Sequence, residues 1–292
     1  MNRSEPPIGM ILVDKPAGMT SHDVVQWVRR LLGTRRVGHA GTLDPLATGL
    51  LPCLVGPATR LVRFLHGWDK CYVGVIALGE ETESGDAEGA EGVRRARVPP
   101  APVLRAAVSR LTGTILQTPP AFSAKKIGGQ PAHRLARRGY RPALPPVRVT
   151  VHRLRLHPRP DGRLLFAARV SSGTYLRALA RDLGRLLGTG AHLERLRRTG
   201  IGPLRVREAV RPGAEEAARG RLLPPEAIPL PFPTLPLGAA ELGRFRSGQP
   251  VPARAIPGRA GWVRVLDPEG RLVGVGEWDG GGAIRPRVVI RP

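Results

Sequence analysis

The side chain best suited to catalysis is Asp44, a carboxylate in a glycine-rich loop of a strongly basic chain. The loop sequence is Gly38-His39-Ala40-Gly41-Thr42-Leu43-Asp44-Pro45-Leu46-Ala47-Thr48-Gly49. Its glycines, proline and threonines interrupt any helical or strand period, which predicts a structured loop. An ionised carboxylate held in such a loop can attack an electrophilic carbon or accept a proton. Because aspartate before proline also binds nearby backbone N–H groups, a purely structural turn is the alternative.

Other familiar catalytic and cofactor-binding patterns do not occur in the sequence. There is no Walker loop, dinucleotide-binding fingerprint or nucleophile-elbow serine. The two cysteines, Cys53 and Cys71, form no CxxC pair, and the seven histidines show no zinc-binding spacing. We therefore expect no metal, no disulfide and no small-molecule cofactor. A glycosidase needs a second carboxylate opposite the first, and the loop offers only Asp44.

The charge of the chain points to a polyanionic partner. Forty-six lysine and arginine residues against 23 aspartate and glutamate residues give a formal net charge of +23. Such a surplus attracts nucleic acid, although a basic surface can also serve solubility alone. Arginine supplies most of this charge, because lysine occurs only at Lys15, Lys70, Lys125 and Lys126.

Several segments, in order and spacing, resemble the TruB family of tRNA pseudouridine synthases. The resemblance covers about residues 10–205 and is most specific across the Asp44 loop and the following Leu50-Leu51-Pro52. The other segments are Asp14-Lys15-Pro16, Lys70-Cys71-Tyr72, Gln117-Thr118-Pro119-Pro120-Ala121-Phe122-Ser123-Ala124-Lys125-Lys126 and Gly173-Thr174-Tyr175-Leu176-Arg177.

The resemblance implies an isomerase that converts the T-loop uridine of tRNA, at position 55, to pseudouridine. Such an enzyme flips the nucleotide out, breaks the bond between uracil N1 and ribose C1′, and rejoins the turned base through C5. This isomerisation needs neither nicotinamide, ATP nor metal. By resemblance Asp44 is the catalytic carboxylate, which attacks C6 or C1′ or removes the C2′ proton.

The resemblance also implies roles for residues outside the loop. Arg177 matches the arginine that pairs with the catalytic aspartate and keeps it ionised in a closed pocket. Tyr72 matches the aromatic side chain that stacks on the flipped uracil. His39 matches the residue that fills the space left by the flipped base. Tyr175 and Leu196 match positions that line the uracil pocket, with core packing as the alternative.

We expect Lys15, Lys125 and Lys126 to contact phosphates of the RNA. Such contacts fix the register of the RNA without reading its sequence. The basic segment from Ile127 to Pro146 resembles the thumb segment with which stand-alone bacterial members clamp the T arm. It favours a stand-alone enzyme over the related guide-RNA-dependent catalytic subunit of box H/ACA particles. A catalytically idle RNA chaperone that folds tRNA is the alternative from another class.

The elements that must position these residues alternate between strands and helices, which predicts an α+β fold. By resemblance this is the pseudouridine-synthase fold, a mixed, largely antiparallel sheet with flanking helices and a basic insertion. Periodicity predicts strands at 9–13, 50–55, 71–78, 147–156 and 163–170. It predicts helices that begin near Thr20, around 58–65 and at 102–111, and a further helix that is opened by the segment 171–177 and ends near Gly188. The acidic segment 80–92 is interpreted as a surface excursion.

The domain organisation follows from proline content and strand patterns. We expect a catalytic domain at 1–211 with an insertion at about 117–146, a proline-rich linker at 212–235 and a small domain at 236–292. Two strands, 261–266 and 272–278, favour a small β-barrel resembling a PUA-type RNA-binding domain. Because the sequence has no secretory apolar core and no membrane-length apolar run, we expect a cytoplasmic protein, and we expect it to be a monomer.

Overall fold

The structure, a computed structural model, describes residues 6–87, 96–120, 126–127, 130–131, 140, 144–252 and 260–290. The chain forms two compact units. Unit 1 comprises Met1–Pro45, Leu50–His66 and Val206–Pro292, and unit 2 comprises Leu46–Gly49 and Gly67–Arg205.

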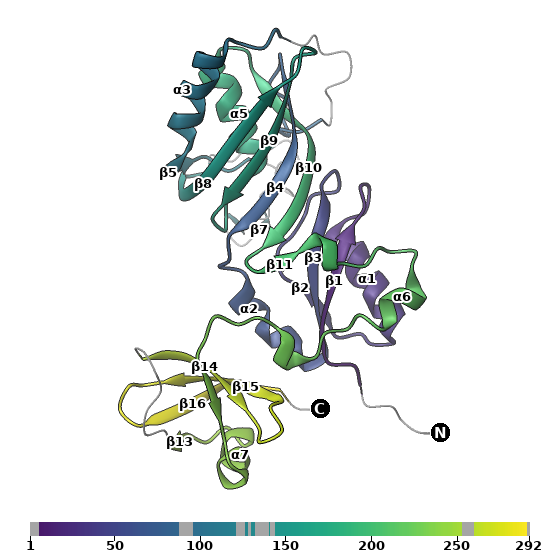
Figure 1. Cartoon of the computed structure of the whole chain (residues 1–292), viewed down its shortest axis with the longest axis vertical. Helices are drawn as coiled ribbons and strands as arrows, with labels where there is room; N and C mark the ends of the chain where they lie inside the picture. Colours follow the sequence, from purple (N-terminus) through teal and green to yellow (C-terminus); the bar gives the residue numbers. More distant parts are fainter. Residues whose placement is uncertain are drawn as a thin grey trace. The chain divides into compact units, whose positions relative to one another are not determined.

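Unit 2 is built on an antiparallel sheet. Its main strands are β4 (Lys70–Leu78), β5 (Gly113–Gln117), β8 (Val147–Pro158), β9 (Arg163–Val170) and β10 (Ala191–Ile201). They lie in the order β10-β4-β9-β8-β5 (Figure 1). Three short strands complete the unit, β6 (Lys126–Ile127), β7 (Gln130–Pro131) and β11 (Leu204–Arg205). β6 pairs with β7, β11 pairs with β10, and Thr48–Gly49 pairs in parallel with Arg197–Arg198 of β10.

Two helices, α3 (Ala101–Leu111) and α5 (Leu176–Leu187), cover one face of this sheet. In Figure 1 α5 lies behind the strands and α3 lies to the left of β8, so no helix lies in front of the sheet face toward the viewer. The strand sequences explain the difference, because successive residues point to opposite faces. On β9, Leu164 and Phe166 point to the covered face and are buried. Ala167 and Arg169 point to the opposite face and are exposed.

The N-terminal part of unit 1 carries Asp44. It contains β1 (Gly9–Lys15), α1 (Ser21–Leu32), β2 (Val37–His39), the part of β3 (Thr48–Val55) from Leu50 on, a 3-10 helix (Gly56–Leu61) and α2 (Val62–Leu65). β3 lies between β1 and β2 in hydrogen-bonding order and pairs antiparallel with β2. α1 begins at a capping box, in which the Thr20 and Asp23 side chains each accept the other's backbone N–H.

The C-terminal part of unit 1 is a curled five-stranded sheet with one helix. Its elements are β12 (Thr234–Pro236), α7 (Ala239–Arg246), β13 (Val251–Pro252), β14 (Gly261–Leu266), β15 (Leu272–Trp278) and β16 (Ala283–Val289). The strand order is β12-β14-β15-β16-β13. Phe245 of α7 is fully buried among Val263, Val265 and Ile284 of these strands.

The segment at 212–235 is folded onto the rest of unit 1. It contains α6 (Glu215–Arg219) and a 3-10 turn (Pro225–Ala227). The Trp27 indole donates to the Glu215 carboxylate (3.0 Å), and Leu223 forms an antiparallel bridge with Met10 of β1. Ile228 is fully buried. The proline-rich segment is therefore packed against the rest of unit 1 along much of its length.

The structure confirms the predicted α+β class, and the predicted strands are present with ends that differ by at most two residues. In the segment 80–92 the described residues Glu80, Glu81 and Glu83 are exposed, as expected for a surface excursion, whereas Thr82 and Asp86 are buried. Outside the ranges left undescribed, no helix is long and apolar enough to cross a membrane. The same residues contain no cluster of three or more histidine, cysteine or acidic side chains that could hold a metal ion.

Candidate active site

The half-buried Asp44 lies in the loop that joins β2 to β3, and hydrogen bonds fix the backbone on both sides of it. Before it, Ser21 Oγ accepts from the Leu43 N–H (2.8 Å) and donates to the Leu43 carbonyl (3.0 Å). After it, the Pro45 carbonyl accepts from the Gly18 N–H (3.0 Å) and from Lys15 Nζ (3.2 Å). The Leu43 side chain is itself buried. The loop therefore holds its carboxylate on a fixed backbone, as a catalytic group requires.

Lys15 has a different role from the phosphate contact expected of it. Its side chain is fully buried at the end of β1, and Nζ also donates to the carbonyls of Pro16 (3.0 Å) and Met19 (2.7 Å). An ammonium that is buried against protein carbonyls is not placed to meet RNA phosphate at the surface. Lys15 is instead a positioning residue for the turn before α1 and for the loop at Pro45.

Replacement of Ser21 by alanine should destabilise unit 1 and loosen this loop. The variant leaves the buried Leu43 N–H without its acceptor, at a cost of about 1–3 kcal/mol. Urea unfolding measures this loss, and the exposed Ser109→Ala on α3 is the matched control, expected to change stability by less than about 0.5 kcal/mol. Equal stability of the two variants would contradict the anchoring role of Ser21.

Tyr72 and Leu196 share one face of the unit 2 sheet. Tyr72 on β4 lies opposite Arg198 on β10, and Leu196 lies opposite Gly74, so the two side chains are diagonal neighbours. Each is 8% exposed. Gly74 between them has no side chain, and an added Cβ would meet the Phe166 ring and the Arg195 carbonyl. The structure thus brings a tyrosine and a leucine together on the face that the helices cover.

The first turn of α5 carries the other two predicted residues of unit 2. Tyr175 is the N-cap, and its backbone N–H donates to Gln117 Oε1 (2.8 Å). Arg177, 7% exposed, follows within that turn. The preceding loop is tied to β4, because Lys70 Nζ donates to Ser172 Oγ (3.0 Å) and to the Trp68 carbonyl (2.7 Å). Burial, reinforced by the neighbouring charge of Arg198, lowers the pKa of Lys70 to about 8.

Asp86 is a buried neighbour of Arg177 that the sequence did not reveal. The Arg177 guanidinium donates to the Ser84 carbonyl (2.9 Å) and lies 3.8 Å from Asp86 Oδ2, with both side chains buried. Asp86 is held in turn by Ser84 Oγ, which donates to Oδ1 (2.6 Å), and by a bridge to Leu193 of β10. The only sequence signal was one aspartate among several acidic residues in a glycine-rich segment, which is typical of a solvated loop.

The predicted site residues are divided between the two units. Unit 1 holds Lys15, Asp44 and His39, which ends β2 opposite Cys53 of β3 and is half-buried. Unit 2 holds Tyr72, Tyr175, Arg177 and Leu196. Lys125 lies outside the described residues, and for Lys126 the structure describes only the backbone, in β6.

Family comparison decides which chemistry this set belongs to. Residues 29–176 match the TruB family pseudouridylate synthase N-terminal domain, 177–212 the tRNA pseudouridylate synthase B C-terminal domain, and 233–290 the pseudouridine synthase II TruB C-terminal domain. The chain belongs to the TruB family. Asp44, Tyr72 and Tyr175 fall within the N-terminal match, and Arg177 is the first residue of the next.

Relatives of the TruB family match nearly the whole chain. The "tRNA pseudouridine synthase B" of Thermobifida fusca is 46% identical over 97% of this chain and 98% of its own length. That of Aromatoleum aromaticum is 43% identical over 97% and 92%, and that of Pseudomonas aeruginosa 40% identical over 97% and 96%.

Solved structures support the same fold. The Cbf5 chain of "Crystal Structure of a Cbf5-Nop10-Gar1 Complex" superposes with a TM-score of 0.74 at 26% identity, covering 98% of this chain and 85% of the other. "Crystal structure of the archaeal box H/ACA sRNP Nop10-Cbf5 complex" gives a TM-score of 0.73 at 25% identity, covering 98% and 87%. The pseudouridine-synthase fold expected for this TruB-family chain is therefore confirmed.

Proposed function

We infer that this protein is a tRNA pseudouridine synthase, an isomerase that converts the T-loop uridine at position 55 to pseudouridine. One observation carries the inference: full-length relatives named tRNA pseudouridine synthase B are 40–46% identical to it over 97% of the chain. The anchored carboxylate of Asp44 supplies the reactive group that such chemistry requires. The net charge of +23 suits a polyanionic substrate.

In the proposed reaction Asp44 acts on a uridine that has left its stack. Its carboxylate attacks C6 of the base or C1′ of the ribose, or removes the C2′ proton, and the N1–C1′ bond breaks. The detached uracil turns and forms a bond from C5 to C1′. The bond between Asp44 and the carbon it attacked breaks in the process, or the C2′ proton returns, and C5 loses its proton while N1 gains one. Atoms balance without an oxidant or a second substrate, so the protein must supply only position, charge and a closed pocket.

The other residues bind and orient the uridine in this proposal. Tyr72 stacks on the flipped uracil, and Leu196, its neighbour on the sheet face, lines the pocket with Tyr175. Arg177 pairs with Asp44 and keeps it ionised. His39 fills the gap that the flipped base leaves in the RNA, which offsets an unstacking cost of a few kcal/mol.

Substrate docking is assigned to regions outside this pocket. We propose that Lys125 and Lys126, in the insertion at about 117–146, contact phosphates of the T arm. The division into a catalytic domain at 1–211, a connecting segment at 212–235 and an RNA-binding domain at 236–292 belongs to the same proposal. The protein acts as a monomer in the cytoplasm, where its tRNA substrate is found.

A guide-RNA-dependent synthase is the second candidate, because the matching solved structures contain Cbf5. Sequence separates the two, since identity is 40–46% to the tRNA enzymes and 25–26% to these Cbf5 chains. The assay uses the purified chain and an unmodified tRNA transcript with no other RNA. We expect one pseudouridine per tRNA, in the T loop. Modification only after a guide RNA is added would support the second candidate, and refolded but unmodified tRNA would support a chaperone.

A further inference from the structure

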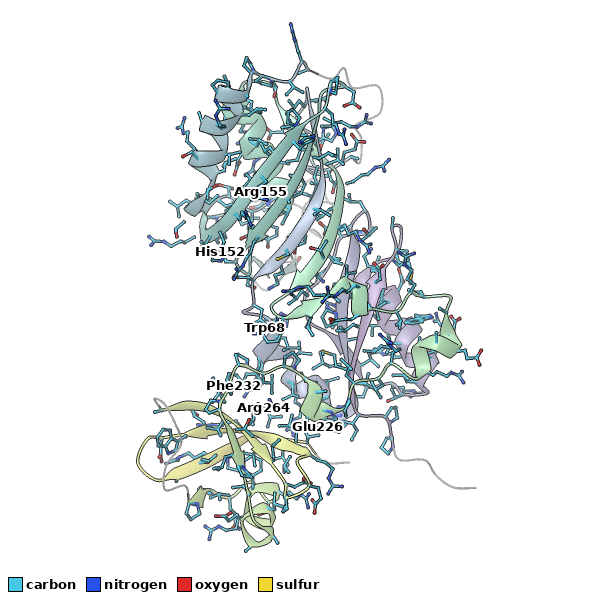
Figure 2. All side chains as sticks on the ribbon, viewed as in Figure 1. Trp68, His152, Arg155, Glu226, Phe232 and Arg264 are labelled. Atoms are coloured by element: carbon cyan, nitrogen blue, oxygen red, sulfur yellow. The ribbon has the colours of Figure 1, made fainter. Side chains whose placement is uncertain are left out.

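The sheet face of unit 2 that α3 and α5 leave uncovered carries arginines on its outer strands. Strand register assigns the residues to this face, because directly opposed residues of an antiparallel pair point to the same side. On this face lie Arg153 and Arg155 of β8, Ala167 and Arg169 of β9, Cys71, Val73 and Val75 of β4, and Arg195 and Arg197 of β10. We call this surface the arginine face. Figure 2 shows the Arg155 side chain on it, toward the viewer.

The arginine face is exposed, and part of its positive charge is not paired with a carboxylate. Arg153, Arg155 and Arg195 are exposed, and Val73 at its centre is 39% exposed. Among the described residues, no carboxylate forms an ion pair with these three arginines. Two acids that neighbour these strands in sequence form other ion pairs, since Asp69 pairs with Arg169 (2.8 Å) and His152 (3.1 Å), and Glu194 pairs with Arg163 (2.8 Å).

The layout of the arginine face fits an extended polyanion. Three interstrand steps separate β8 from β10, so two rows of arginine stand about 14 Å apart. Small or aliphatic side chains lie between them, namely Cys71, Val73 and Ala167. None of the described residues assigned to this face is Phe, Tyr or Trp, so it offers no platform on which unpaired bases could stack.

We propose that the arginine face binds the phosphate backbone of a base-paired RNA segment. Two separated rows of guanidinium groups can contact both strands of a stem, and the flat strip between them leaves room for its groove. This contact is distinct from uridine binding, because Tyr72 and Leu196 point to the opposite face of the same sheet. The arginine face is thus a second RNA-binding surface, separate from the uridine pocket, and it recognises the shape and charge of the RNA.

The test is binding of a blunt-ended RNA duplex that has no loop, measured as a function of salt. In the variant Arg153→Gln/Arg155→Gln/Arg195→Gln we expect affinity to fall at least about 10-fold, and the slope of log affinity against log salt to become shallower by about 2 to 3. The matched control is Arg97→Gln/Arg105→Gln/Arg110→Gln, which removes three exposed arginines before and along α3. The control should keep the wild-type slope.

A lysine version, Arg153→Lys/Arg155→Lys/Arg195→Lys, keeps the charge and should retain the slope, which excludes a folding defect as the cause. An unchanged slope in the glutamine variant, or an equal loss in the α3 control, would overturn the proposal. Tighter binding of single-stranded RNA than of the duplex would overturn it too. The duplex assay involves no isomerisation, so its outcome is independent of whether the protein forms pseudouridine.

Discussion

Asp44→Asn is expected to form pseudouridine at least about 10³-fold more slowly than the wild type while binding tRNA with similar affinity. Asparagine has nearly the same shape, but its amide is neutral and is neither a nucleophile nor a base. The backbone contacts that hold the loop come from Ser21, Lys15 and Gly18, so they do not depend on the carboxylate. Single-turnover conversion of a tRNA transcript measures the chemical step, and filter binding measures affinity.

The control for Asp44→Asn is Asp161→Asn, which makes the same chemical change at an exposed surface ion pair with Arg163. It should retain wild-type turnover and stability. Full turnover by Asp44→Asn would refute the nucleophile assignment, whatever its structural role. Loss of binding together with turnover would instead mean that the loop had collapsed, and thermal unfolding of the variant distinguishes this case.

Arg177→Met should reduce turnover by about 10²–10³-fold at neutral pH, the range found when one charge-stabilising donor is removed. In the proposed mechanism the guanidinium pairs with the Asp44 carboxylate, so its loss removes the positive charge that stabilises this carboxylate. Arg177→Lys keeps a positive charge and should therefore lose less turnover than Arg177→Met, whereas a purely structural role would make the two losses equal.

Two further variants separate the roles of Arg177. Asp86→Asn keeps the guanidinium but removes its buried partner, 3.8 Å away, and should weaken turnover less than Arg177→Met does. Arg185→Met, two turns farther along α5, breaks an exposed pair with Glu81 and should leave turnover unchanged. Wild-type turnover by Arg177→Met, or an equal loss in Arg185→Met, would contradict the proposed pairing with Asp44.

Sequence patterns predicted the helices and strands that bury one face and expose the other. α1 has an apolar stripe of Val24, Trp27, Val28 and Leu31 behind a capping box at Thr20, and both signals are local. On β9 every second residue is buried and the residues between them are half-buried or exposed, and its predicted bounds at 163–170 agree with the structure. Neither element needed knowledge of its neighbours.

β10 was not predicted because its pattern depends on partners far away in the chain. It contains Glu194, Arg195, Arg197 and Arg198, of which Arg198 is 1% exposed, so charge does not mark the solvent side. Burial of such a residue is decided by pairing with β4 and with Thr48–Gly49. An added Cβ at Gly49 would meet the Arg198 backbone, a close approach that no local pattern encodes.

The candidate site shows the same limit. The loop around Asp44 was predicted because the order of its glycines, its proline and its single acidic residue is a local sequence signal. The contacts that hold the site residues were not predicted, because they join residues far apart in the sequence. Ser21 binds the backbone of Leu43, 22 positions away, and Asp86 lies beside Arg177 although its segment has the composition of a solvated loop. Lys15 was expected to contact phosphate, yet the fold buries it against backbone carbonyls.

Release of tritium from tRNA that carries [5-³H]uridine tests the central claim most directly, because C5 loses its hydrogen only when it bonds to the ribose. The purified chain should release one tritium per tRNA from the T-loop uridine, with no guide RNA and no added cofactor. Asp44→Asn, bound to the same tRNA, should release essentially none. Equal release by Asp44→Asn, or no release by the wild-type chain from a correctly folded tRNA, would contradict the account.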